Sequence, residues 1–177
     1  MHISKIDVFK KLCGHPERIV WAVAQANGKR SICPLGAQMG ASFKPPIIAI
    51  CVSPRNFTHG LITASGEFVL SWPGESLAEA TLFCGTKSGR DVDKFAETDI
   101  TTRPGRYVKA PIIEQSIANL ECRLAGQINS GDHTVFLGEI ICVWTNKHPQ
   151  KQLCLVGNEK GCRVLVKKGI YKIGVIK

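Results

Sequence analysis

The sequence has no apolar run long enough to cross a membrane, and its opening residues lack the features of a signal peptide. A membrane-spanning helix needs about 20 consecutive apolar residues. The opening stretch, MHISKIDVFKK, contains neither an apolar core nor a small-residue cleavage site. We therefore expect a cytoplasmic protein that has no membrane partner.

Cysteine pairs of the kind that bind metals are also missing. The 177-residue chain has eight cysteines but no C-x-x-C motif, and such motifs supply many zinc and iron–sulfur ligands. We therefore predict no metal site. Cys51, Cys122 and Cys142 lie in apolar segments, which indicates small core side chains. Free thiols suit a reducing cytosol.

Several catalytic and nucleotide-binding motifs are absent as well. The sequence contains no G-x-G-x-x-G, no H-E-x-x-H and no G-x-S-x-G, which leaves Rossmann dinucleotide binding, zincin chemistry and α/β-hydrolase chemistry unsupported. The GTKSGR stretch at 85–90 superficially resembles a P-loop, but it lacks the required G-x-x-x-x-G-K-[ST] order.

Aromatic residues make up only 7% of the chain, although the net charge is +9. A basic surface attracts nucleic acid, but single strands also need an aromatic stacking platform. We therefore expect no nucleic-acid partner, because a phosphate-bearing cofactor or an acidic redox partner suits the charge equally well. A nucleic-acid-binding barrel is the alternative from another class, and it predicts a colourless protein with salt-sensitive DNA binding.

Short apolar segments separated by turn signals predict one mainly β domain over residues 1–177, and the few helices favour a closed or partly closed antiparallel barrel. Pro34, Gly36 and Gly40 make 33–42 a poor strand, so we expect irregular backbone on which something flat can lie, or else a bulged loop. The expected strands are 19–26, one from about 30, 47–52, 67–70, 120–127, 133–144 and one or two within 162–176. The expected helices are 3–13, one from Phe57 to Gly66, 76–84 with Ser76 and Glu79 as a capping box, and a turn or two within 91–97.

The stretch from Pro45 to Phe68 is the most informative part of the chain. It places a polar loop with Ser53, Arg55 and Thr58 between a buried strand and the start of a helix. Free backbone N–H groups, a guanidinium and hydroxyls at a helix start predict an anion site. The alternative is a surface loop whose serine and threonine only cap the helix.

Six local patterns follow one another in a particular order, and together they resemble the flavin reductase-like, FMN-binding split-barrel family, most closely its flavoredoxin-type branch. The resemblance runs from about residue 19 to about residue 171. The patterns are Ser42-x-x-Pro45-Pro46, Arg55-x-x-Thr58, Ser65-Gly66-Glu67-Phe68-Val69, Ser88-Gly89-Arg90-Asp91-Val92-Asp93-Lys94-Phe95, Leu120-Glu121-Cys122, and Gly131-Asp132-His133 leading to Gly138-Glu139-Ile140.

The resemblance implies a six-stranded Greek-key split barrel with small flanking helices, and a homodimer with FMN near the subunit interface. It implies a flavoprotein that mediates electron transfer. The protein would be either an NAD(P)H:flavin oxidoreductase, with NADH or NADPH as donor, or a flavoredoxin-like carrier served by a redox protein partner. A flavin-binding split-barrel protein without its own reductase turnover is the alternative function.

The resemblance also implies roles for individual residues. The backbone of 34–39 would lie along the isoalloxazine ring, and 51–53 would continue that wall. Arg55 and Thr58 would hold the phosphate, and Lys94 would help to close over the cofactor or else be a plain surface lysine. His133 would lie beside the flavin and any nicotinamide donor, as a tentative catalytic residue. The implied cofactor-binding residues are Pro34, Leu35, Gly36, Ala37, Gln38, Met39, Cys51, Val52, Ser53, Arg55, Thr58, Ser88, Gly89 and Lys94.

One departure from the family pattern concerns the segment before the double proline. Many reductases of the family carry a threonine and a serine there, whereas residues 33–38 of this chain have no hydroxyl group. Flavin contacts in this segment would therefore be mostly to backbone atoms. Together with the many cysteines, this departure slightly favours the carrier over the reductase.

Overall fold

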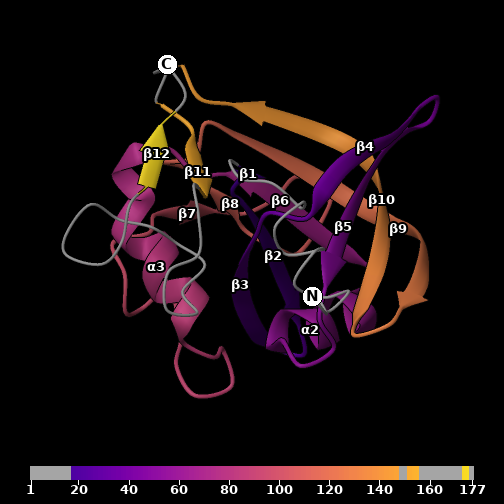
Figure 1. The fold of residues 1–177 in the computed structure, drawn as a ribbon, viewed down its shortest axis with the longest axis horizontal. Coiled ribbons are helices and arrows are strands. Elements are labelled where there is room, and N and C mark those ends of the chain that lie inside the picture. The colour runs from indigo at the N-terminus through magenta and orange to yellow at the C-terminus, as the bar shows by residue number, and fades with distance from the viewer. Residues whose placement is uncertain (1–16, 148–150, 156–172, 176–177) are drawn as a thin grey trace, which may run out of the picture.

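The computed structural model describes residues 17–147, 151–155 and 173–175 (Figure 1). The expected helix over 3–13 lies outside these ranges, as does most of 162–176. Within the described ranges, no helix is long and apolar enough to cross a membrane.

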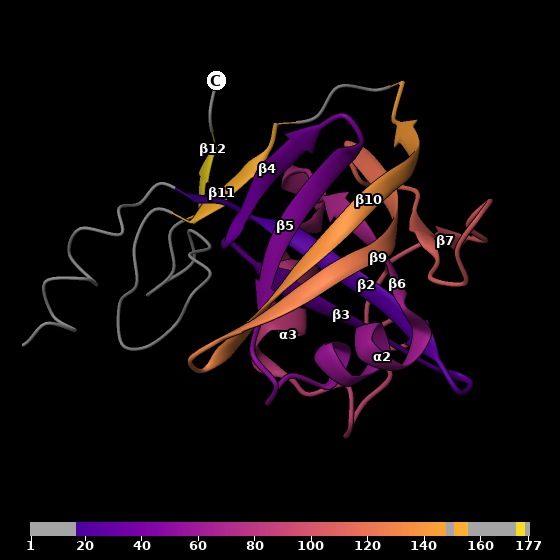
Figure 2. The ribbon, with the colours of Figure 1, turned by 90° about the vertical axis from the view of Figure 1, so that its right-hand side faces the viewer.

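A seven-stranded sheet dominates the fold, in the order β3-β2-β6-β9-β10-β5-β4, and every neighbouring pair is antiparallel. Figure 2 shows β4, β5, β10 and β9 lying in front of β2, β3 and β6, so the sheet curls on itself. Its edges, β3 and β4, follow one another in the chain, which leaves the barrel split between them. The strands are β2 Val20–Ala26, β3 Lys29–Leu35, β4 Gln38–Phe43, β5 Pro46–Val52, β6 Glu67–Trp72, β9 Ala118–Ser130 and β10 His133–Thr145.

Two small sheets accompany the barrel. One contains β1 Glu17–Arg18, β11 Leu153–Leu155 and β12 Ile173–Val175, and the other pairs β7 Thr102–Arg103 with β8 Ile112–Ile113. The expected mainly β split barrel is confirmed. The described sheet has seven strands where six were expected, because the segment before the double proline also pairs as a strand.

The prediction of irregular backbone over 33–42 is wrong for most of that segment. Strand β3 runs through Pro34 to Leu35, and β4 begins at Gln38. Pro34 is tolerated because β3 is an edge strand, on which a missing N–H breaks no ladder. The irregularity is confined to the turn at 36–37 and to a register shift between Gly40 and Ser42.

Two hairpins match the turn signals in the sequence. Asn27 and Gly28 both have positive φ, 52° and 71°, as a two-residue turn between β2 and β3 requires. Strands β9 and β10 are each 13 residues long and pair along most of that length, with two register shifts. Their turn contains Gly131 at a φ of 61°, so the second expected hairpin is also confirmed.

Helix α2 spans Phe57–Ser65, and Gly66 ends it in the left-handed region with an N–H bond to the Ile62 carbonyl. The expected end at Gly66 is therefore confirmed. The N-cap is Asn56, whose side chain makes no capping bond. The alternative in which the loop serine or threonine caps this helix is wrong, because the helix begins at the residue after Asn56.

Helix α3 spans Ala78–Thr86 and follows a 3-10 turn, η1, at Glu75–Leu77. The expected capping box at Ser76 and Glu79 is wrong, because Leu77 is the N-cap residue of α3. Leu77 is 4% exposed, and its N–H bonds to the Gly74 carbonyl at 3.0 Å, as a 3-10 turn requires. Residues 93–97 make one turn with bonds from 96 and 97 back to the Asp93 carbonyl.

Apolar side chains fill both faces of the central strands. Along β2, Val20 and Ala22 face the cluster that contains α2, whereas Trp21 and Val23 face the cluster that contains α3. This alternation explains why 19–26 is apolar almost throughout and confirms a buried strand. The two helices therefore pack on opposite faces, and both contact β3.

Candidate functional site

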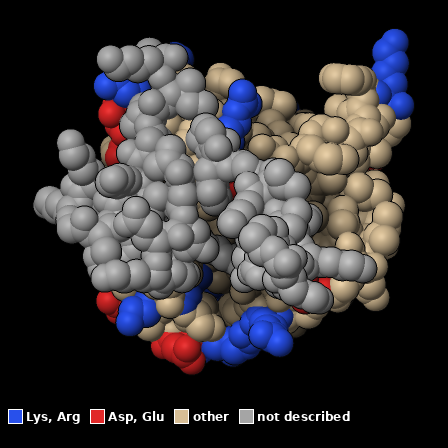
Figure 3. All heavy atoms as spheres, in the orientation of Figure 1, with Lys and Arg blue, Asp and Glu red and all other residues tan. Residues whose placement is uncertain are grey.

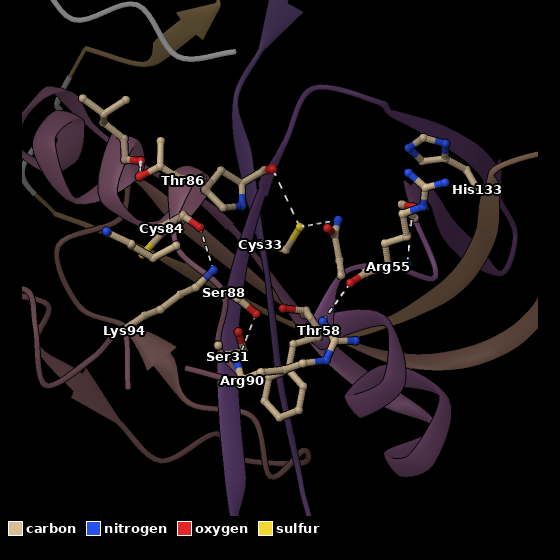
Figure 4. Close-up of a pocket in the computed structure, with 18 of the residues that line it drawn as sticks. Ser31, Cys33, Arg55, Thr58, Cys84, Thr86, Ser88, Arg90, Lys94 and His133 are labelled. Carbon is tan, nitrogen blue, oxygen red and sulfur yellow. Dashed lines mark hydrogen bonds between the residues drawn. The ribbon is translucent and has the colours of Figure 1, made fainter. Parts of the chain in front are cut away.

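A cavity of about 730 Å³ lies where four segments meet: β3, the start of α2, the end of α3 with its following loop, and the β9–β10 turn. This volume falls within the range typical of cofactor sites. Figure 4 shows Lys94 and Cys84 on one side of the cavity, Arg55 and His133 on the other, and Cys33 and Ser31 between them.

Eight of the residues implied by the family resemblance line this cavity, although they come from five separate stretches of the chain. They are Pro34, Ser53, Arg55, Thr58, Ser88, Gly89, Lys94 and His133. The tertiary fold therefore brings together residues separated by up to 99 positions, between Pro34 and His133.

Seven other implied residues do not line the cavity. Two of them end β5, and the other five lie where the chain leaves the cavity at the end of β3 and crosses to the opposite edge of the sheet. There it pairs with β5, and Met39 is 64% exposed. Their roles against a flavin stay predictions. They are Leu35, Gly36, Ala37, Gln38, Met39, Cys51 and Val52.

One end of the cavity contains the loop and helix start that the sequence predicted as an anion site, and binding of an anion there stays a prediction. The first turn of α2 contains no acidic residue, and Thr58, in that turn, is 2% exposed. Arg55 is exposed two residues before the helix begins, and the first N–H groups of a helix have no partner within the helix itself. His133 Nδ1 lies 2.8 Å from Asp132 Oδ1, and this contact lowers the pKa of Asp132.

Arg90 lines the same cavity, although the resemblance assigned it no role. Its Nη1 donates a 2.8 Å hydrogen bond to the Arg55 carbonyl, and its guanidinium lies over the ring of Phe57 at 5.6 Å. Arg90 therefore ties the loop after α3 to the loop before α2. A basic residue next to Ser88-Gly89 was visible in the sequence, but nothing there showed which way it pointed.

Lys94 is 5% exposed, so the alternative of a plain surface lysine is wrong. Its Nζ donates to the carbonyl oxygens of Ile32 at 2.7 Å and Cys84 at 2.6 Å. Burial lowers its pKa, because removal from water disfavours the charged form. The Cys84 carbonyl lies in the last turn of α3, where the helix dipole favours a cation.

Ser31 is the buried polar residue that sequence reasoning missed. It is 0% exposed, it lines the cavity, and its hydroxyl has no hydrogen-bond partner within the described part of the chain. A Cβ on Gly89 would overlap the Ser31 hydroxyl and lie 2.9 Å from a ring carbon of Phe57. The loop after α3 therefore approaches β3 so closely that only glycine fits at 89.

Cys33 lies two residues beyond Ser31 on the same face of β3 and also lines the cavity. The Asn56 amide donates to its sulfur at 3.3 Å. The alternation of Ser31 and Cys33 along a strand was the sequence signal for a shared face. Hydroxyl, thiol and cationic groups therefore surround one space, which suits a polar, negatively charged ligand with an apolar part.

Comparison with known proteins identifies the family. Residues 12–164 match the flavin reductase-like domain. The chain belongs to the flavin reductase-like family. It is 37% identical over 102 residues to an uncharacterised protein of Archaeoglobus fulgidus, an alignment that covers 58% of each chain. It is 35% identical over 102 residues to an NADH-dependent FAD reductase of Streptomyces globisporus, covering 56% of this chain and 54% of the relative.

Solved structures agree with the fold. An FMN-binding protein of Thermus thermophilus matches 89% of this chain and 90% of its own, with a TM-score of 0.78 and 25% identity. A flavoredoxin of Methanosarcina acetivorans matches 100% of this chain and 91% of its own, with a TM-score of 0.79 and 21% identity. Membership of the family supports flavin-related electron transfer.

Proposed function

We propose that this protein binds FMN in the cavity and passes electrons through it, as a flavoredoxin-like carrier or as an NAD(P)H-dependent flavin reductase. The observation that carries the proposal is the grouping of Arg55, Arg90, Lys94 and the α2 N-terminus around one cavity of about 730 Å³. These donors suit a ligand with a phosphate dianion and an oxygen-bearing ring.

The residues present fit a flavin by an observation independent of the family. The buried Ser31 hydroxyl points to a ligand that completes its hydrogen bonding, since buried polar groups are rarely left unpaired. When bound, FMN supplies a ring that takes up and releases electrons. The protein's own part is to hold that ring and exclude water from it.

Each end of the cavity has a separate task in this proposal. The N–H groups at the start of α2, with Arg55 and Thr58, hold the phosphate. Pro34 and Cys33 form a wall of β3 against which the ring lies. His133, which contacts Asp132, lies on the same side of the cavity as Arg55 (Figure 4), and its expected part beside the flavin and a donor stays a prediction.

FMN and a nicotinamide donor are proposed because of what similar proteins are described as binding or using. Two similar structures are described as FMN-binding proteins of Thermus thermophilus, and a relative from Streptomyces globisporus is an NADH-dependent FAD reductase. Because these chains are similar rather than the same, FMN and NADH or NADPH enter as part of the proposal.

A homodimer is also part of the proposal. Three large apolar side chains are exposed on β4 and β10: Met39 at 64%, Phe43 at 98% and Val143 at 58%. The β4–β5 hairpin that carries Phe43 stands out from the barrel in Figure 1. Exposed apolar groups of this size suit burial against a second copy.

The charged groups favour a protein partner over nucleic acid. Figure 3, in the orientation of Figure 1, shows both Lys or Arg and Asp or Glu side chains on the described surface that is visible there. We infer that a redox protein, if it serves as donor, brings acidic groups to the basic side chains near the cavity. Free thiols at Cys51, Cys84, Cys122, Cys142 and Cys154 support a reducing, cytoplasmic setting.

An anaerobic visible spectrum of the purified protein with FMN tests the proposal, recorded before and after NADH and then NADPH. Prompt bleaching of a yellow protein by either nucleotide is expected of the reductase. Bleaching only by dithionite or a reduced protein donor is expected of the carrier. A protein that shows no flavin band after incubation with FMN would overturn the proposal.

A further inference from the structure

Two walls of the cavity are joined by a pair of side chains that lie outside its lining. Thr58 in the first turn of α2 lines the cavity, and so does His133 at the start of β10. The next residues along the two elements are His59 and Thr134, and His59 Nε2 lies 2.9 Å from Thr134 Oγ1, within hydrogen-bonding distance. This bond therefore links the helix start to the strand that carries His133.

The surroundings of this bond are largely apolar. Thr134 is 2% exposed, and the half-buried His59 ring packs against the ring of Phe136 at a centroid distance of 5.0 Å. Phe136 is fully buried and lies two residues beyond Thr134, on the same face of β10. Burial lowers the pKa of His59 below its usual value of 6.5, so the imidazole is neutral at about pH 8.

The spacing between α2 and β10 depends on side chains. Helix α2 packs on β2 and β3, whereas β10 lies between β9 and β5 in the sheet. Among the described residues, no backbone hydrogen bond joins α2 to β10. The position of the helix start relative to the β9–β10 turn is therefore not fixed by a backbone ladder.

A polar pair at this place suits positioning better than stabilisation. A buried hydrogen bond adds little net stability, because both groups lose water before they gain each other, and apolar groups of the same shape can serve equally well. Apolar contacts are not directional, however, whereas a hydrogen bond restricts both distance and angle. The bond between His59 and Thr134 therefore restricts how the two walls lie relative to one another.

We propose that His59 is a positioning residue, which fixes the β9–β10 turn relative to the start of α2 so that both walls contact one bound flavin nucleotide. This inference rests on the proposed function, in which the phosphate lies at the start of α2 and the flavin lies beside His133. A shift between the walls would cost FMN its phosphate contacts. Riboflavin has no phosphate, so the same shift would cost it less.

Two substitutions remove the bond from either side. His59→Phe keeps a ring against Phe136, and Thr134→Val keeps the shape of the threonine. Each is expected to lower the ratio of FMN affinity to riboflavin affinity about tenfold and to change the visible circular dichroism of bound FMN. The unfolding temperature of the ligand-free protein should change little.

Two further variants test whether the bond itself is the cause. His59→Gln places an amide close to the position of Nε2, so it is expected to keep the affinity ratio and the circular dichroism of the wild type. The double variant His59→Phe with Thr134→Val is expected to lose about tenfold, as each single variant does, because all three lack the same bond.

The experiment titrates each protein with FMN and with riboflavin at about pH 8, where His59 is neutral, and follows flavin fluorescence. Visible circular dichroism of each FMN complex and thermal unfolding of each ligand-free protein complete it. Thr63→Val is the control, since Thr63 is exposed on the same helix and its hydroxyl donates to the His59 carbonyl within α2. It is expected to match the wild type in every measurement.

Unchanged affinity ratios and circular dichroism in His59→Phe and Thr134→Val would overturn the inference. A lower unfolding temperature in these variants would then assign the pair a structural role only. If His59→Phe does not fold, Thr134→Val decides the question by the same measurements. Losses in His59→Gln equal to those in His59→Phe would also count against the bond. A wild-type protein that binds neither flavin would instead refute the proposed function itself.

Discussion

The indole N–H of Trp144 donates a 2.7 Å hydrogen bond to a carboxylate oxygen of Glu121, across the β9–β10 pair. Glu121 is 0% exposed, and its two oxygens also accept backbone N–H bonds from Arg106, Tyr107 and Val108 at 2.6–3.0 Å. One buried carboxylate therefore fixes the loop at 106–108 against the barrel, as well as the tryptophan ring.

Removing one acceptor from this cluster should destabilise the fold. In Glu121→Gln, the amide nitrogen cannot accept the bonds that one carboxylate oxygen accepts now, so at least one buried N–H loses its partner. We expect a loss of about 2–3 kcal/mol in the free energy of unfolding, measured by urea denaturation. Glu97→Gln, at an exposed position, is the control and should change little. Equal stability of the two variants would refute this assignment.

The same carboxylate predicts a dependence of stability on pH. Burial alone would raise the pKa of Glu121, but hydrogen bonds from Trp144 and from the three backbone N–H groups lower it below its ordinary value. A lowered folded-state pKa gives stability that is present above the unfolded pKa of about 4.3 and is lost as the pH falls through the folded value. Unfolding free energies of the wild type should therefore fall below about pH 4, and less steeply in Glu121→Gln.

Replacing each of two glycines with alanine should change the stability of the protein in opposite directions. Gly89→Ala would force its new Cβ against Ser31 and Phe57, whereas a Cβ at Gly60, inside α2, meets nothing within 4 Å. We expect Gly60→Ala to stabilise the protein by about 0.5–1 kcal/mol. Gly89→Ala should destabilise it by about 1–3 kcal/mol and weaken flavin binding. Calorimetry of both variants checks this prediction, which fails if Gly89→Ala is neutral in both respects.

Arg55 provides a test of the phosphate position. Replacing it with methionine removes a charged donor from the start of α2, so FMN affinity should fall about 10- to 100-fold. Riboflavin affinity should stay at the wild-type value, because riboflavin has no phosphate. Titration of both ligands measures this difference, and an equal loss for both would contradict the assignment.

Phe43 provides a test of the proposed dimer. Its side chain is 98% exposed on the projecting hairpin, so Phe43→Ser should not affect folding of the monomer. If the hairpin contacts a second copy, the dissociation constant of the dimer should rise at least about tenfold, as analytical ultracentrifugation would show. Tyr107→Ser, at another exposed aromatic position, is the control. A wild-type protein that sediments as a monomer would refute the dimer.

Local sequence determined those parts of the fold that depend on neighbouring residues. Asn27-Gly28 specified a tight hairpin because both residues accept positive φ, and Gly66 ended α2 for the same reason. The apolar segment of β2 indicated a strand buried on both faces. These features need only backbone sterics and burial, which a short stretch of sequence encodes.

Some elements depend on the tertiary structure, and local sequence patterns predicted them wrongly. Pro34 and Gly36 indicated a poor strand, yet β3 and β4 form at the sheet edges, where a proline breaks no ladder. A sequence cannot show which strands become edges. Likewise, Ser76 and Glu79 fitted a capping box, but a 3-10 turn over Glu75–Leu77 precedes α3, and Leu77 is the N-cap residue.

The candidate site also has one part that the local sequence predicted and another that only the tertiary structure showed. The sequence alone determined that a polar loop with Arg55 and Thr58 precedes a helix, because strand, turn and helix signals follow one another there. Only the tertiary structure placed Ser31 and Lys94, 63 positions apart in the chain, in the lining of one cavity. Their burial depends on how the loop at Gly89 packs on β3, a long-range contact that no local pattern records.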